Sequence, residues 1–202
     1  IAIGSNAKVN NVNGGIALGN SSTSGNANAV SIGTNSTSGG SSAVSIGNSS
    51  SAGTDNSVAI GNLAAVTGYG GLAVGWNSKS STGATSFGNQ AQATSDFSSA
   101  IGFKARASEK YAVAIGSGQD NLTNNTQASG ESSVAIGGNS SAGAKSSGKN
   151  AVAIAGESVA SGANAIAIGR KSTSSNVGAI ALGDSGTASG AHCRQCALPA
   201  TP

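Results

Sequence analysis

The sequence predicts an all-β fold, a parallel β-roll (β-solenoid) of about 13 coils with a 14-residue repeat. Composition gives the first reason: 32 residues are Gly, only 8% are charged and 3% are aromatic, which is typical of a repeat protein and not of an ordinary globular core. A tetrad of apolar, small, apolar and Gly residues recurs along the whole chain, as in a solenoid. Side-chain character alternates with period two inside each tetrad, and this alternation indicates a strand.

The glycines that close the tetrads keep one register from end to end. Most lie 13 to 15 residues apart, and Ala155 stands in for one of them: Gly4, Gly19, Gly33, Gly47, Gly61, Gly75, Gly88, Gly102, Gly116, Gly137, Gly169 and Gly183. Two intervals are longer, and we expect insertions there, at about residues 117–130 and 143–150. Solenoid insertions map to loops, so the coils themselves are expected to stay regular.

Each coil is expected to hold two short strands and two tight turns. The residues one and three positions before the glycine are mostly Val, Ile or Leu, and we expect them inside the coil because large aliphatic side chains favour the interior. Offsets three and five after the glycine are mostly Ser or Ala, which predicts a second strand with a small inward face. Equivalent positions would stack at about 4.8 Å, and the glycine suits a turn with positive φ.

The middle residue of the tetrad is Ala or Ser in every coil. A solvent-facing strand position would carry Thr, Lys, Glu or Gln in some coils, since these suit an exposed strand better than Ala. We therefore expect this row to pack closely against other copies of the chain. The predicted packing face comprises Ala17, Ser31, Ser45, Ala59, Ala73, Ala100, Ala114, Ala135, Ala153, Ala167 and Ala181.

The repeat resembles a known family. Residues 56–61 read Asn-Ser-Val-Ala-Ile-Gly, with variants at 133–137 and 150–154, and this pattern is similar to the head repeat of YadA-like trimeric autotransporter adhesins over about residues 1–190. The resemblance implies a left-handed roll, a homotrimer and display at the tip of a longer chain on the Gram-negative outer membrane. It also implies a non-enzymatic head that attaches to extracellular matrix protein, host cells or another host surface ligand.

All six aromatic residues lie between positions 69 and 111. Phe87 occupies a predicted interior position before Gly88, and the others are expected at turns. Exposed aromatic and basic side chains are typical of interaction surfaces, although large side chains could equally cover coil edges or meet a neighbouring chain. The candidate ligand surface comprises Tyr69, Trp76, Lys79, Phe97, Phe103, Lys104, Arg106, Lys110 and Tyr111.

Signals for chemistry are weak, so we expect no enzyme, cofactor or metal. Residues 183–186 read Gly-Asp-Ser-Gly, as in chymotrypsin-like proteases, but they fall in repeat register and the chain has one histidine, His192. Cys193 and Cys196 form a single Cys-x-x-Cys, too few ligands for zinc, and a disulfide is at least as plausible. We interpret residues 191–202 as a non-repeat tail.

The net charge of +3 is spread along the chain, whereas nucleic-acid binding needs a concentrated basic face. No apolar run is long enough for a membrane helix, so we expect neither nucleic-acid binding nor membrane insertion by this chain. Because the sequence opens inside a repeat, it is expected to be part of a longer protein.

Three alternative functions stay open: a structural spacer, an ice-binding solenoid and a phage tail-fibre module. Ice binding predicts a uniform Thr row, but the fourth residue after each glycine varies: Lys8, Thr23, Thr37, Ser51, Ala65, Lys79, Gln92 and Arg106. A spacer predicts that replacing Trp76, Phe103 and Tyr111 together leaves surface attachment unchanged.

Overall fold

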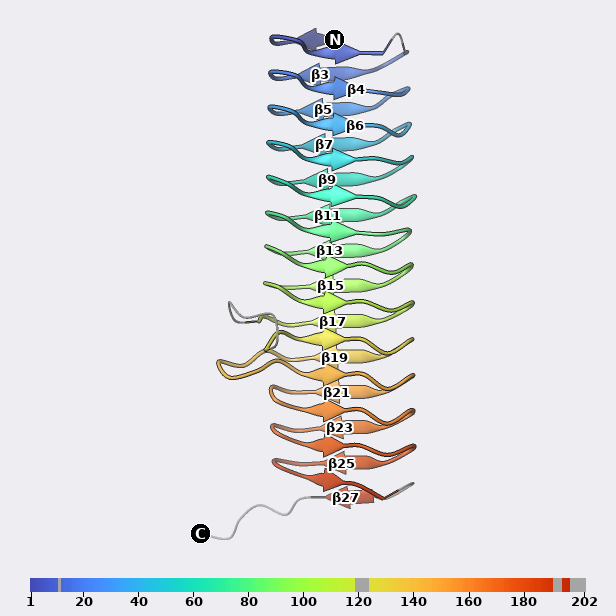
Figure 1. The fold of residues 1–202 in the computed structure, drawn as a ribbon, viewed down its shortest axis with the longest axis vertical. Helices are drawn as coiled ribbons and strands as arrows, with labels where there is room; N and C mark the ends of the chain where they lie inside the picture. The colour runs from blue at the N-terminus through green and yellow to red at the C-terminus, as the bar shows by residue number, and fades with distance from the viewer. Residues whose placement is uncertain (11, 119–123, 191–193, 197–202) are drawn as a thin grey trace. The chain divides into compact units, whose positions relative to one another are not determined.

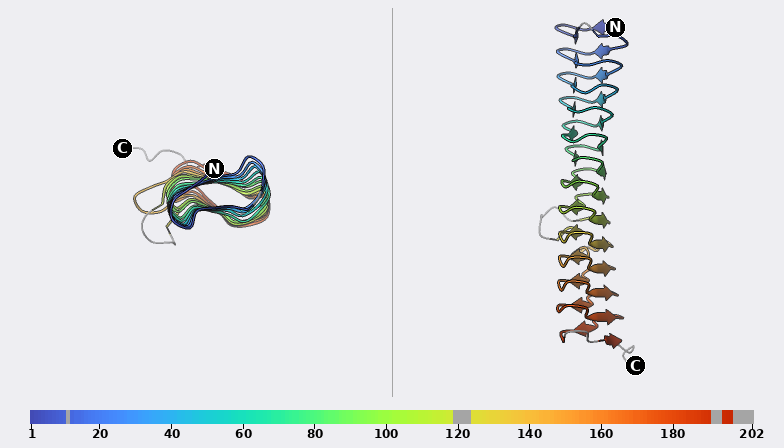
Figure 2. Two further views of the ribbon diagram at one scale, coloured as in Figure 1. Left: turned by 90° about the horizontal axis from the view of Figure 1, so that it is seen from above. Right: turned by 90° about the vertical axis from the view of Figure 1, so that its right-hand side faces the viewer.

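The protein is an all-β parallel β-solenoid of about 13 coils, as predicted. The computed structural model describes residues 1–10, 12–118, 124–190 and 194–196, and these contain no helix and therefore none that could cross a membrane. The chain divides into two compact units, Ile1–Phe97 and Ser98–Pro202. In each unit an odd-numbered strand alternates along the chain with an even-numbered strand of two residues, and the coils stack as flat loops (Figures 1 and 2).

Unit 1 contains two parallel ladders. One ladder consists of β1 (Ala2–Ile3), β3 (Ile16–Leu18), β5 (Val30–Ile32), β7 (Val44–Ile46), β9 (Val58–Ile60), β11 (Leu72–Val74) and β13 (Thr85–Phe87). The other consists of β2 (Lys8–Val9), β4 (Thr23–Ser24), β6 (Thr37–Ser38), β8 (Ser51–Ala52), β10 (Ala65–Val66), β12 (Lys79–Ser80) and β14 (Gln92–Ala93).

Unit 2 is built in the same way. Its odd-numbered ladder consists of β15 (Ser99–Ile101), β17 (Val113–Ile115), β19 (Val134–Ile136), β21 (Val152–Ile154), β23 (Ile166–Ile168), β25 (Ile180–Leu182) and β27 (Arg194–Cys196). Its even-numbered ladder consists of β16 (Arg106–Ala107), β18 (Gln127–Ala128), β20 (Lys145–Ser146), β22 (Val159–Ala160), β24 (Thr173–Ser174) and β26 (Thr187–Ala188). We expected the repeats to end at residue 190. Because β27 pairs with β25, the ladder continues beyond that residue.

Equivalent positions of successive coils are paired, as the glycine register predicts. Ala59 lies opposite Ser45 in the preceding coil, and the Gly61 N–H donates to the Ile46 carbonyl at 2.8 Å. Gly61 itself has a φ of 130°, and an added Cβ would lie 2.5 Å from the Gly75 carbonyl oxygen of the next coil. Positive φ and the close approach of backbone therefore both require glycine here, which confirms the predicted turn.

The interior of each coil is lined by small side chains. The Ala and Ser residues at offsets three and five after the glycine are buried, for example Ser50 and Ala52, which confirms the predicted small inward face. The middle residue of the tetrad points to the same interior, and its exposed fraction is 0% at Ala17, Ser31, Ser45, Ala59, Ala73, Ala100, Ala114, Ala135, Ala153, Ala167 and Ala181. The prediction that this row forms the face toward other copies is wrong, because the row packs inside its own chain.

The large aliphatic side chains of the tetrads lie outside the coil. The exposed fraction is 41% at Leu18, 37% at Ile60 and 38% at Ile168, so their predicted place in the interior is wrong, as is that of Phe87, which is 55% exposed.

The narrowness of the coil explains this inversion. Inside one coil, the Ser45 hydroxyl on β7 lies 2.7 Å from the hydroxyl of Ser50, which directly precedes β8. Two small side chains are already in contact there, and a close-packed interior leaves no room for a pair of Val or Ile side chains at these positions.

Unit 2 contains two longer connections, both after odd-numbered strands (Figure 1). The first joins β17 to β18 and includes residues 119–123, which lie outside the described part of the chain. The second joins β19 to β20 and runs over residues 137–144, whereas we expected its extra residues at 143–150. The buried Thr126 hydroxyl donates to the Gly137 carbonyl at 2.8 Å, so the two connections are tied together.

Candidate ligand-binding surfaces

The structure places the candidate ligand residues at three kinds of location. Turns that follow odd-numbered strands lie at the left of Figure 1, and turns that follow even-numbered strands lie at the right. The turns after odd-numbered strands carry Trp76 in unit 1, and Phe103 and Lys104 in unit 2. The turns after even-numbered strands carry Tyr69 and Phe97 in unit 1, and Lys110 and Tyr111 in unit 2. The remaining two candidates, Lys79 and Arg106, are on the strands β12 and β16. Within each unit, these side chains are therefore on different edges and do not form a single continuous band.

The turn aromatics are open to solvent. The exposed fraction is 60% at Tyr69, 46% at Trp76, 51% at Phe97 and 53% at Tyr111. Rings this exposed contribute little to the packing of their own coil, because most of their apolar area stays in water. Each of them is accessible to a ligand.

Two of these aromatics adopt a backbone conformation that disfavours them. Phe97 has a φ of 57° and Tyr111 a φ of 58°. The equivalent turn position in other coils is filled by residues such as Asn28 and Asn56, which adopt left-handed φ at lower energy than a bulky residue does.

In unit 1, Tyr69 and Phe97 are on the turns that follow even-numbered strands, and each contacts a residue of another turn on the same edge. The Asn56 side-chain amide donates to the Tyr69 hydroxyl at 3.0 Å. The Phe97 ring lies over Gly83, where an added Cβ would come within 2.8 Å of the ring. Gly70 has open space where its Cβ would be, so these two rings border a part of the edge that has no large side chain of its own.

In unit 2 the aromatic and basic groups make local contacts. The Lys104 ammonium lies 5.1 Å from the centroid of the Phe103 ring, within cation–π range. Ion pairs elsewhere in the described part of unit 2 include Lys149 with Glu131 at 2.9 Å, Arg170 with Asp184 at 3.0 Å and Lys171 with Glu157 at 3.8 Å. They are partly or fully open to solvent, where such pairs contribute under about 1 kcal/mol each.

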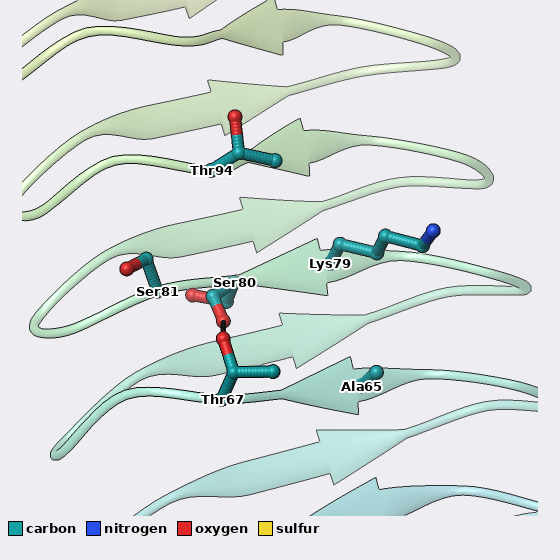
Figure 3. A pocket seen from close by; sticks show the side chains of 6 residues that line it. All are labelled: Ala65, Thr67, Lys79, Ser80, Ser81 and Thr94. Carbon is teal, nitrogen blue, oxygen red and sulfur yellow. Dashed lines mark hydrogen bonds between the residues drawn. The ribbon is translucent and has the colours of Figure 1, made fainter.

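Sequence reasoning missed a hollow on the outer side of β10 and β12. It has a volume of about 310 Å³, and Figure 3 shows the lining side chains of Ala65, Thr67, Lys79, Ser80, Ser81 and Thr94. Only Lys79 was among the predicted site residues. The signal was available: Gly75 and Gly88 are 13 residues apart, and this is the shortest interval between tetrad glycines.

The residues suspected of chemistry form no assembled site in the described part of the chain. The protease-like segment 183–186 follows β25 as an ordinary turn, and its Asp184 is paired with Arg170. No group of three potential metal ligands is found among the residues that the structure describes. His192 and Cys193 lie outside the described residues, and only the backbone of Cys196 is described.

The fold and these surfaces define a repeat protein that presents one sheet face and two rows of turns, with small side chains inside. The family model of the YadA head domain repeat matches residues 38–64, 55–78, 80–105, 98–118, 124–140, 128–154 and 160–185. These matches cover more than half of the chain, and the chain therefore belongs to the YadA head repeat family. Membership indicates an adhesin-type head that is exposed at a cell surface.

The collagen-binding domain of the Yersinia adhesin YadA is a similar solved structure. It shares 21% sequence identity with this chain, the match covers 81% of this chain and 70% of that one, and the TM-score is 0.48. The search of curated proteins gave no significant match.

Proposed function

We propose that the chain is the head of a homotrimeric adhesin of the Gram-negative outer membrane. Copies associate through the outer face of the odd-numbered strands, and the other surfaces attach to an extracellular matrix protein or another host surface ligand. The anchor is supplied by other parts of a longer protein. Family membership supports the adhesin class, and the apolar sheet face carries the proposal of self-association.

The apolar face is present in both units. In unit 1 it includes Leu18, Ile60 and Phe87, and in unit 2 it includes Ile101 and Ile168. These side chains stack coil upon coil, since Val58 and Ile60 lie opposite Val44 and Ile46. A repeated row of partly exposed Val and Ile forms a continuous apolar surface of the kind that marks an interaction site.

The even-numbered strands supply the contrast. Their outer positions are mostly polar, with Lys8, Thr23 and Thr37 in unit 1 and Arg106 and Lys145 in unit 2. One outer face is therefore suited to water and the other to burial. The occupant that fits a row repeated along the chain is another copy of the same row, and the family resemblance supports three copies.

The turn aromatics are the proposed contacts to host ligands. They lie at the edges of the coils and are separate from the apolar face. Three copies would present each edge three times, so that weak single contacts add up through avidity.

Light scattering on residues 1–190 tests the oligomer. We expect a molar mass close to three times that of the monomer. The double variant Ile46→Lys with Ile60→Lys should lower this mass, because burying unpaired charges is costly. Its matched control is Thr37→Lys with Ser51→Lys, on β6 and β8 of the other ladder. A folded monomer, or equal loss of mass in both double variants, contradicts the assigned face.

Binding of the trimer to immobilised matrix proteins tests attachment, with albumin as the negative surface. Replacing Tyr69 and Phe97 by Ser probes one edge, and replacing Trp76 by Ser probes the other. We expect at least one change to weaken binding while the mass stays trimeric. If neither matters and the Trp76, Phe103 and Tyr111 triple variant also binds normally, the spacer function is favoured.

A further inference from the structure

The hollow beside β10 and β12 lies where one coil is shorter than its neighbours. The turn between β12 and β13 runs over residues 81–84, whereas the turn between β10 and β11 runs over residues 67–71. Both turns close with a backbone hydrogen bond, from Ala84 to Ser81 at 3.3 Å and from Gly71 to Gly68 at 3.2 Å. The shortening therefore leaves the ladder intact, and the hollow of about 310 Å³ opens on its outer side.

One side of the hollow offers hydrogen-bond acceptors. The Thr67 hydroxyl donates to the Ser80 carbonyl at 3.4 Å, and the Ser81 hydroxyl donates to the Asp96 carboxylate at 3.3 Å. Because each hydroxyl already uses its proton within the chain, its oxygen faces a ligand as an acceptor. In Figure 3, Thr67 and Ser81 lie on the same side of the hollow, with Thr94 above them.

The other side offers a cation. Lys79 is exposed, and among the described residues its ammonium has no hydrogen-bond or ion-pair partner. Figure 3 shows its side chain extending from β12 away from Ser81, on the side where Ala65 lies. Ala65 occupies the position that carries Ser51 and Lys79 in the adjoining coils, and its short side chain leaves the space beside Lys79 open.

We propose that this hollow binds a carboxylate-bearing sugar residue of the uronic acid type. The proposal rests on the proposed function, since it names a ligand for the head. Lys79 would hold the carboxylate, and Thr67 and Ser81 would accept hydrogen bonds from ring hydroxyls. Two residues along a strand place the Cα atoms of Lys79 and Ser81 about 6.6 Å apart. The long, flexible Lys79 side chain can bring its ammonium to the far end of a pyranose ring that contacts Thr67 and Ser81. A volume near the lower limit for ligand sites, about 300 Å³, fits a single ring.

The charges around the hollow set the orientation of the sugar. The Asp96 carboxylate lies beyond Ser81, and it repels an anionic group at the acceptor side. Lys79 attracts the same group at the opposite side. The methyl groups of Ala65, Thr67 and Thr94 line the hollow and can contact the C–H face of the ring. Inorganic phosphate or sulfate could pair with Lys79 but would not offer ring hydroxyl groups as hydrogen-bond donors to Thr67 and Ser81.

Saturation-transfer NMR on the folded chain tests the ligand class directly. The probes are methyl glucuronide and methyl glucoside, which differ only in whether C6 is a carboxylate or a hydroxymethyl group. We expect transfer to the glucuronide and at least about a tenfold weaker interaction with the glucoside, since a charge-assisted hydrogen bond contributes that factor or more. Equal binding of the two probes, or no binding of the glucuronide, overturns the proposal.

Two variants and two matched controls test the location. Lys79→Gln removes the cation. Ala65→Lys fills the hollow with a long side chain, and the equivalent strand position already carries lysine in other coils, at Lys8 and Lys79. Their controls are Lys8→Gln and Ser51→Lys, at the same offset in other coils. We expect the first pair to lose glucuronide binding by about tenfold and the controls to retain it. Binding that survives in both Lys79→Gln and Ala65→Lys overturns the assignment to this hollow.

The outcomes separate this inference from the proposed function. A trimer that attaches to matrix proteins but shows no response to the glucuronide overturns the sugar site alone. A monomer that binds the glucuronide at Lys79 overturns the trimeric head and keeps the sugar site. Circular dichroism on each variant confirms that the fold is retained, because the altered residues are on the outside of the coil.

Discussion

Replacing Ala59 by Leu distinguishes the two possible assignments of the strand faces. Ala59 lies on β9 with an exposed fraction of 0%, between Ser45 and Ala73 of the adjoining coils. If it faces the interior, the added carbon atoms must displace side chains of the same chain. Ala52, Ala64 and Val66 belong to the same buried cluster, so no adjacent space can receive the larger side chain.

The magnitude follows from this packing. Overfilling a well-packed interior costs about 1–3 kcal/mol, and the narrow distance between the two strands of the coil places Ala59→Leu at the upper end. With a urea dependence of about 3 kcal/mol/M, as for a chain of this size, the unfolding midpoint should fall by about 1 M. The effect acts within each chain, so the molar mass of the folded protein should not change.

Ala65→Leu is the matched control, because it makes the same change on the outer side of the next even-numbered strand, β10. It should shift the free energy of unfolding by no more than about 0.5 kcal/mol. Urea titration followed by far-UV circular dichroism measures both variants, and light scattering measures their mass. An Ala59→Leu protein of normal stability that has lost its partners would refute the interior assignment.

Three further predictions concern the turns and the assembly. Gly61→Val should lower the free energy of unfolding by about 3 kcal/mol or more in urea titration, because it adds both left-handed strain and a contact with the Gly75 carbonyl. Phe97→Asn should raise the free energy of unfolding by about 1 kcal/mol in urea titration, because Asn accepts a φ of 57° more readily; an unchanged or lower free energy of unfolding contradicts the strain at this turn. If folding is coupled to association, the thermal midpoint of the wild-type protein should rise with concentration, and scanning calorimetry over a hundredfold dilution series at constant scan rate measures this.

The register of the fold could be predicted from the sequence because it depends on backbone geometry. A glycine such as Gly61 needs positive φ and room for the Gly75 carbonyl, and no other residue type meets both needs without strain. The period-two alternation around it then places a strand at Val58–Ile60. Both signals are local, and both hold in the structure.

The direction of the strand faces could not be predicted from hydrophobicity alone. The rule that Val and Ile lie inside presumes an interior wide enough to hold them. Here the Ser31 and Ser36 hydroxyls already meet at 2.7 Å inside the coil, so two large side chains do not fit at these positions. A stronger sequence signal was the fourth residue before the glycine, Ala29 or Ala43, which is also small and buried. Small residues at four positions of each coil, namely two and four before the glycine and three and five after it, together indicate the interior.

The position of the second insertion and the hollow were missed for related reasons. Ser140 and Ala142 fit the small-residue register after Gly137 as well as Ala144 and Ser146 do, but the structure uses the later pair. The hollow beside Lys79 depends on a turn that is one residue short, and a difference of one residue is within the variation that the repeat shows elsewhere. Its ligand chemistry becomes visible only when side chains from three coils are brought together.

The inverted faces also link the proposed self-association to the small amount of large apolar interior in each chain. Among the described residues, Val66 is the largest side chain that is fully buried, and the rest of the interior is almost entirely Ala and Ser. Most of the large aliphatic area is held on the outer face of the odd-numbered strands, where only a partner can bury it. The same residues would then provide both the driving force for association and the missing hydrophobic stabilisation of each coil. The proposed trimer would keep its turn edges and its polar ladder free to contact a ligand.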